Sequence, residues 1–330
     1  MQTQLIYGVE GTYATRQTPS RALEFASESL KAQQEHLASA GLRTDAWVPL
    51  KKTRKLGKKD GSGSVVHEIA DRGMVFLFDQ MFGNAAKTQP SVGPDPTVYQ
   101  YTSTLVTLVG KSLSCQVGRE ALDGLMHPYD YMGLKVASWK ISGETGKFAT
   151  LELAFDIADF ANEHFGGPGG VGYALVTPPV YPAAYEPLIV VDASVTFDIS
   201  DQYPFTSFTL SGDNGLRTDA YHGSGVKSEP IIDKQRAVTL EVAGDYIDER
   251  VQKRLDSGET CAVVIKLEGS TISHAYKYGL EVTIPAMATE GDQPNVGGYG
   301  RLDQAVNMVL VDNETDEPIT SVFTTTDSAA

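Results

Sequence analysis

Apolar and polar residues alternate along several short stretches of the chain, and this period of two predicts β strands. Residues 149–156 have one apolar face, made of Leu151, Leu153 and Phe155, opposite a polar face. The same kind of run recurs at 65–69, 190–197, 238–242, 262–267, 280–284 and 305–311. Clusters of Gly, Asn and Asp separate these runs, which is typical of antiparallel sheets.

Two short stretches have helical character. The first spans residues 72–82, and its segment 74–78 (MVFLF) is apolar on all sides, so a helix there needs cover on more than one face. That cover could come from its own sheet together with a neighbouring module, or from its own domain alone. Residues 249–255 form the second helix, with Asp248 as a predicted N-cap. Its apolar stripe consists of Ile247, Val251 and Leu255.

One motif occurs twice. Residues 41–47 read GLRTDAW and residues 215–221 read GLRTDAY, at an offset of 174. A strand and a helical stretch follow each copy in the same order, which indicates an internal duplication. A competing match between residues 150–156 and 239–245 has an offset of 89. We follow the GLRTDA alignment, because several elements keep its order.

The duplication predicts two modules. They are residues 1–165 and 190–330, joined by a Gly/Pro-rich linker over residues 166–189. A chain of 330 residues fits two domains of roughly 150 residues each. Residues 133–136 (GLKV) match 279–282 (GLEV) at a smaller offset, so the first module carries an insertion between Gly83 and Gly133. The predicted fold class is all-β with minor α, with one short helix in each module.

The net charge is −15, from 27 basic and 42 acidic residues. This balance argues against affinity for nucleic acid, which requires clustered Lys and Arg. The N-terminus has no basic start followed by an apolar run, and prolines interrupt the most apolar stretch, residues 171–191. We therefore expect no signal peptide and no membrane partner. Cys115 and Cys261 lie in strand-like apolar contexts and are expected to be buried free thiols.

No catalytic constellation is present among the known motifs. The sequence has no GxSxG elbow, P-loop, HExxH or CxxC, and its six histidines lack metal-ligand spacing. The glycine-rich residues 166–170 precede no helix, so they favour a linker over a phosphate-binding loop. Residues 312–317 lack calcium-loop spacing and predict an acidic turn. We expect no enzymatic activity, no catalytic residue, no cofactor and no metal.

Six basic residues lie within nine positions, opposite in charge to the rest of the chain. They are Lys51, Lys52, Arg54, Lys55, Lys58 and Lys59. The run follows the first GLRTDA copy and ends in residues 60–64 (DGSGS), which predict a flexible loop. It is either a solvated loop or an arm that docks on an acidic surface of another copy and joins stacked rings.

Several motifs resemble siphophage tail tube proteins in their order along the chain. They are residues 8–15 (GVEGTYAT), 18–19 (TP), 28–30 (ESL), 112–119 (SLSCQVGR), 127–129 (HPY), 213–219 (DNGLRTD) and 229–231 (EPI). The resemblance spans nearly the whole chain.

This resemblance implies a β-sandwich with a flanking helix in each module. It further implies rings whose inner strands close a β-barrel on oligomerisation, and stacking of rings into the tube that conducts DNA. Most members of the family carry one module and form hexamers, so a chain with two modules implies a trimeric, pseudo-hexameric ring, with a hexamer as the alternative. It also implies a location in the virion tail, assembly in the host cytoplasm, and other tail proteins as partners at the tube ends.

A tube that conducts DNA without specific binding calls for an acidic or neutral lumen. We predict that polar strand faces line it. The candidates are Thr150, Glu152, Asp156, Thr239, Glu241 and Asp245. These faces could instead look outward to solvent. The alternative function is a two-domain β-sandwich binding module on a virion or cell surface.

Overall fold

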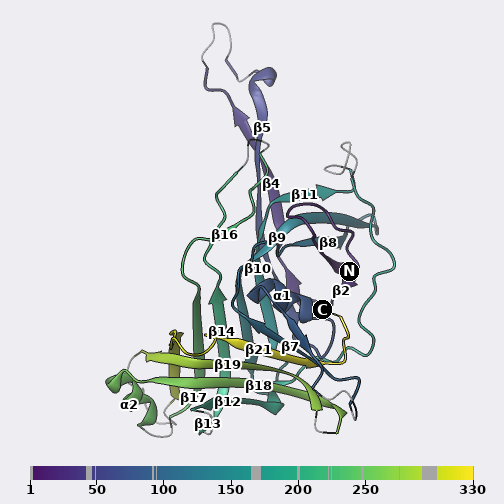
Figure 1. The fold of residues 1–330 in the computed structure, drawn as a ribbon. Coiled ribbons are helices and arrows are strands. Elements are labelled where there is room, and N and C mark those ends of the chain that lie inside the picture. The colour runs from purple at the N-terminus through teal and green to yellow at the C-terminus, as the bar shows by residue number, and fades with distance from the viewer. Residues whose placement is uncertain are drawn as a thin grey trace.

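The computed structural model describes residues 3–41, 47–48, 50–90, 93, 95–164, 172–198, 201–221, 223, 225–246, 249–274, 276–291 and 303–329. The first GLRTDA copy lies mostly outside these ranges, so only the second can be followed. Strands dominate the fold and two short helices accompany them (Figure 1). The predicted class, all-β with minor α, is confirmed.

The first half contains these elements in chain order: β1 (Thr3–Val9), β2 (Arg21–Ala22), β3 (Ser27–Glu28), β4 (Lys31–Ala38), the 3-10 turn η1 (Lys51–Thr53), β5 (Arg54–Glu68), α1 (Val75–Phe82), β6 (Ala86–Thr88), β7 (Tyr99–Thr104), β8 (Leu113–Glu120), β9 (Met126–Glu144), β10 (Thr150–Ile157) and β11 (Asp159–Asn162). The second half contains the 3-10 turn η3 (Val190–Asp192), β12 (Ala193–Phe197), β13 (Asp201–Tyr203), β14 (Phe205–Asp213), β15 (Leu216–Arg217), β16 (Ile231–Ile232), β17 (Ala237–Asp245), α2 (Arg250–Ser257), β18 (Thr260–Ser273), β19 (Tyr276–Glu290), β20 (Asp303–Leu310) and β21 (Thr320–Thr325).

Each predicted strand is present, and the alternation of side chains explains why. On β10, Leu151, Leu153 and Phe155 are buried, whereas Thr150 and Glu152 are partly exposed. The apolar side chains of both halves join one continuous hydrophobic core. Because a strand sends successive side chains to opposite faces, this pattern fixes which face of each strand packs inward.

The two halves share one order of antiparallel pairing. In the first half, β3 and β4 pair with β5, which continues to β10, β9, β8 and β1. In the second half, β14 pairs with β17, which continues to β20, β19, β18 and β12. A helix follows the second strand of each series, α1 after β5 and α2 after β17.

The two helices differ in burial. Seven of the eight residues of α1 are buried, and the helix packs on β7 and β9 of the same chain. Its own chain therefore supplies the cover that its apolar surface requires. The helix ends at Gly83, whose φ of 107° suits glycine, and an added Cβ would lie 2.6 Å from the Thr107 carbonyl oxygen. No residue of α2 is buried, and the predicted cap and stripe residues Asp248 and Ile247 lie outside the described residues.

The halves join through their sheets. β14 pairs with the C-terminal part of β9, from Ser207 opposite Glu144 to Asp213 opposite Ser138. A second connection runs through the insertion, since β6 pairs with β7, β7 pairs with β21, and β21 pairs with β19 (Figure 1).

The segment predicted to be a linker packs against the first half from residue 172 onward. The Gln4 side-chain amide donates to the Val176 carbonyl at 2.9 Å, and the Ala22 amide donates to the Val180 carbonyl at 3.1 Å. Leu188 belongs to the core. Residues 165–171 lie outside the described residues.

Candidate assembly surfaces

Six neighbouring strands, β5, β10, β9, β14, β17 and β20, form one sheet with an open face. The pairing register places Glu152 opposite Lys140, Lys140 opposite Ser211, and Ser211 opposite Thr239. Small and hydroxylated side chains dominate this face: Ser64, Ser138, Ser142, Ala154, Ser207, Thr209, Ser211 and Ala243. The other face of the same strands packs into the core, so this face stays open to solvent or to another copy.

The open face is acidic. Among its described side chains, the acidic ones are Glu68, Glu144, Glu152, Asp213, Glu241 and Asp245. The same register places one basic side chain among these described residues of the face, Lys140. Glu144 also pairs with Lys147 of the following turn, at 2.7 Å. Anionic ligands are therefore repelled by this surface.

The structure brings five of the six predicted lumen residues onto this one face. Thr150 and Glu152 lie on β10, and Thr239, Glu241 and Asp245 lie on β17. β9 and β14 separate the two strands, so the face runs across both halves of the chain.

Asp156, the sixth, corrects the prediction. It has the right strand parity, but it is buried with 7% of its surface exposed. Lys227 covers it, with its Nζ 2.6 Å from the Asp156 carboxylate and 2.8 Å from that of Asp60. Burial raises the pKa of Asp156 to about 6, although Lys227 lowers it. Asp156 therefore serves an ion pair inside the single chain and is not exposed on the open face.

The basic run lies on a hairpin and not on a flexible loop, which corrects a second prediction. Lys51 and Lys52 lie in η1, and the other four basic residues lie on β5, which pairs with β4. Residues 61–64 are held between β10 on one side and the β3–β4 segment on the other. Gly61 is required there, since an added Cβ would lie 2.7 Å from the Ala32 Cβ.

We call the hairpin beyond the last β5–β10 pair, residues 33–60, the arm. Figure 1 shows it extending away from the rest of the chain. Two basic residues anchor its base: Lys59 forms an ion pair with Asp159, and the Lys58 ammonium lies 4.8 Å from the centre of the Tyr221 ring. The outer basic residues, Lys51, Lys52, Arg54 and Lys55, are exposed.

Apolar side chains accompany the outer charges of the arm. Leu37 and Leu56 are about half exposed, and Trp47 and Val48 are more so, at 98% and 72%. Large exposed apolar side chains on a projecting element mark a contact surface. The sequence had indicated only the charges.

The outer edge of β3 and β4 is open. In the part of the chain that the structure describes, these strands pair with β5 alone. The corresponding strand of the second half, β14, pairs on its outer edge with β9. The first half therefore presents an edge whose counterpart is already filled within the chain.

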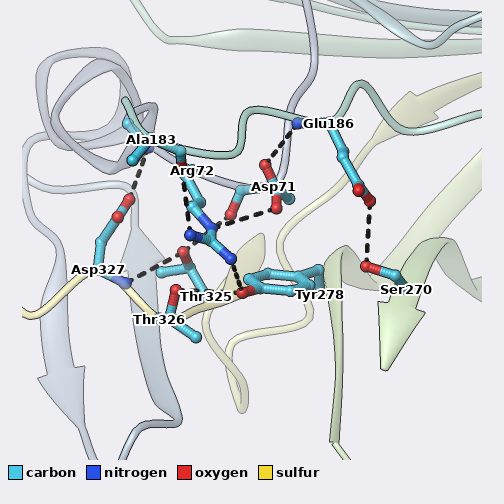
Figure 2. Close-up of polar contacts among 10 residues, drawn as sticks. Asp71, Arg72, Ala183, Glu186, Ser270, Tyr278, Thr325, Thr326 and Asp327 are labelled. Carbon is cyan, nitrogen blue, oxygen red and sulfur yellow. Dashed lines mark hydrogen bonds and ion pairs between the residues drawn. The ribbon is translucent and has the colours of Figure 1, made fainter. Parts of the chain in front are cut away.

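A polar network links four distant segments (Figure 2). The Arg72 guanidinium donates to the Ala183 carbonyl at 3.1 Å and to the Tyr278 hydroxyl. The Gly73 amide donates to the Asp327 carboxylate at 2.6 Å. The network joins the first half, the 172–189 segment, the second half and the C-terminal residues. No sequence motif marked it.

Among the described residues, no group of three His, Cys, Asp or Glu side chains could hold a metal ion. Cys115 and Cys261 are buried free thiols, as predicted, and burial raises the pKa of Cys261 to about 11. Over the same described ranges, no helix has the length and apolar character needed to cross a bilayer.

A comparison with protein families finds one that covers most of the chain. The family model described as phage tail tube protein matches residues 2–308. No curated protein matches the sequence.

Proposed function

The chain belongs to the phage tail tube protein family and is a structural subunit of the virion tail, and from this we propose that three copies close into one ring of the tube. Members of this family assemble with themselves into a tube and with other tail proteins. The proposed role requires no catalysis. DNA passes through without specific binding.

The junction between β9 and β14 carries this proposal. It joins the two halves edge to edge, so a single chain already contains one module-to-module contact of the kind that a ring repeats. Under the proposed division, residues 1–165 and 190–330 are the modules. Three chains then supply six modules, and a repeated head-to-tail contact closes when its rotation allows.

The contact between chains would use the open edge of β3 and β4. The strand offered by the next chain would be the end of β19, because β19 occupies in the second half the place that β9 occupies in the first. Among the described residues, β18 no longer pairs with β19 beyond Ala288, so Thr289 and Glu290 have β20 alone as a strand partner. Residues 292–302, which follow, lie outside the described residues.

The acidic open face would line the lumen. In a ring closed through strand edges, one face of the sheet points to the axis and the other to the core, and the core face is already occupied. Glu152 and Glu241 would then repel DNA from both modules and keep it from binding the wall.

The experiment that tests the ring combines imaging with mass measurement. Negative-stain images of the purified protein should show rings or tubes with a central channel, and the mass of an isolated ring should equal three chains. A mass of six chains would favour the hexamer. A protein that stays monomeric at high concentration and at every salt concentration would contradict the proposal.

A further inference from the structure

At Leu30, on the strand edge of β3 and β4 that no other described strand pairs with, side chains of the same chain bind the backbone amide and carbonyl. The Leu30 amide donates to the Glu28 carboxylate at 2.9 Å. The Leu30 carbonyl accepts from the Arg119 guanidinium and from the Tyr131 hydroxyl, both at 2.9 Å. Both backbone groups of Leu30 are therefore satisfied without a strand partner.

Arg119 holds this arrangement in place from β8. Its Nε and Nη2 donate to the two carboxylate oxygens of Glu28, each at 2.9 Å. The guanidinium also lies 4.7 Å from the centre of the Tyr129 ring. A paired, planar fork of this kind is among the stronger polar contacts in proteins. Both side chains are only partly buried, with 34% of Arg119 and 15% of Glu28 exposed.

The second half shows what occupies the same place when a strand is present. The two helices begin at Val75 and Arg250, 175 positions apart, which is one more than the offset of the GLRTDA copies. An offset of 175 aligns Gly63 of β5 with Val238 of β17. Leu30 lies opposite Gly63 and Gly212 lies opposite Val238, so Leu30 and Gly212 hold the same place in their halves. Gly212 faces Trp139 of β9 across the module junction. In the second half, β9 thus pairs with the outer edge of β14. In the first half, side chains bind the corresponding backbone groups of Leu30.

We propose that the Glu28 carboxylate, held by Arg119, is a removable cap on the Leu30 amide at the edge of β3 and β4, and that the Leu30 amide leaves it when a second copy of this chain adds its strand there. The inference rests on the proposed ring. Unpaired edges promote uncontrolled association, and charged side chains protect them. An incoming strand needs only backbone groups to bind. It would take over the Leu30 amide, while Glu28 and Arg119 stay paired with each other at the rim.

The test is Glu28→Ala, which removes the acceptor of the Leu30 amide. This change should weaken the unassembled chain more than the ring, because the neighbouring strand replaces Glu28 only in the ring. The threshold concentration for ring formation, measured by sedimentation velocity, should fall by about tenfold, as for the net loss of one charge-assisted hydrogen bond. Arg119→Lys should leave the threshold nearly unchanged, because Arg119 stays paired with Glu28 both in the unassembled chain and in the ring. Glu268→Ala is the control, since Glu268 pairs with Lys266 and Lys277 away from this edge.

Hydrogen exchange at the Leu30 amide gives a second measurement. Exchange should be faster in unassembled Glu28→Ala than in the unassembled unsubstituted protein, and equally slow in rings of both. Rings that form at an unchanged or higher threshold, or a Leu30 amide that stays fast in the rings of the variant, would overturn the cap and leave the ring standing. If neither protein forms rings under any condition, the ring fails and the cap with it.

Discussion

Glu152 and Glu241 are the residues that test which face of the sheet meets DNA. Both lie on the open face, on β10 and β17, with Glu152 partly exposed and Glu241 exposed. Changing both to Lys should leave rings and tubes intact, because solvated positions contribute little to folding. Tubes of this variant should retain DNA at low salt and release it as salt rises, since Lys contacts with phosphate weaken with salt. A filter-binding assay on purified tubes measures this.

The matched control makes the same two Glu-to-Lys changes outside the open face. Glu314 and Glu317 lie in the exposed acidic turn between β20 and β21, on none of the six strands of the open face. Tubes carrying Glu314→Lys and Glu317→Lys should release DNA as the unsubstituted tubes do. Equal DNA retention by both double variants, or none by either, would show that the open face does not line the channel.

Individual side chains also show where sequence patterns stop being informative. Alternation placed Asp156 on the polar face, and its strand parity is right. Its burial depends on Lys227, 71 positions away in the chain, and no local pattern encodes that contact. The same holds for Glu28 and Arg119, which belong to different strands and meet only in the folded chain.

At the scale of elements, the arm provides the next prediction. Its outer basic residues, Lys51, Lys52, Arg54 and Lys55, are exposed, whereas Lys58 and Lys59 contact Tyr221 and Asp159 of the same chain. Replacing the outer four with Ser should leave rings intact and shorten or abolish tubes, because an arm that docks on an acidic neighbour loses its attraction. Tube length, measured by electron microscopy across a salt series, is the readout.

The inner pair gives the contrasting variant. Lys58→Ser and Lys59→Ser remove charge from the same hairpin but act first on its attachment to the body, so they should lower the thermal stability of the isolated subunit. Tubes of ordinary length from the outer variant at every salt concentration would show that the arm does not join rings.

The strands were predictable because their burial alternates, and α1 because its residues are apolar on all sides. The alternation on β10 and β17 and the apolar run of α1 each mark one element without reference to the rest of the chain. The strands of the arm were not predictable, because a composition rich in Lys, Gly and Ser favours a loop. Pairing with β4 along the hairpin, and with β10 at its base, overrides that local preference.

At the scale of the whole molecule, the sequence predicted two related halves but did not predict how they join. The GLRTDA copies indicated two related halves, and the pairing order repeats in them. The contact of β7 with β21 spans more than 200 positions, and the hydrogen bond from Thr325 to the Asp71 carbonyl spans 254. Contacts of this range depend on the assembled fold and leave no local signature.

The C-terminal residues join the halves and lie beyond residue 308, where the family match ends. Thr326 hydrogen-bonds to Tyr278 at 3.2 Å, and Asp327 accepts from the Gly73 amide through its carboxylate and from the Tyr101 hydroxyl through its carbonyl. Figure 2 shows Tyr278, Thr326 and Asp327 around Arg72. A chain that ends at Thr325 loses them and keeps β21 and the shared core. We expect the free energy of unfolding to fall by about 3 kcal/mol, at roughly 1 kcal/mol for each of these three hydrogen bonds after solvation is counted.

Because one core and one sheet cross both halves, the shortened chain should still unfold in a single calorimetric transition, at a lower midpoint temperature. A chain that ends at Ser328 keeps these contacts and should unfold at the midpoint of the full chain. Two separate transitions in the full chain would mean that the halves fold independently, and the junction between β9 and β14 would then be too weak to serve as the template for a ring. An unchanged midpoint in the chain ending at Thr325 would instead show that the C-terminal contacts add no stability, with the β9–β14 junction unaffected.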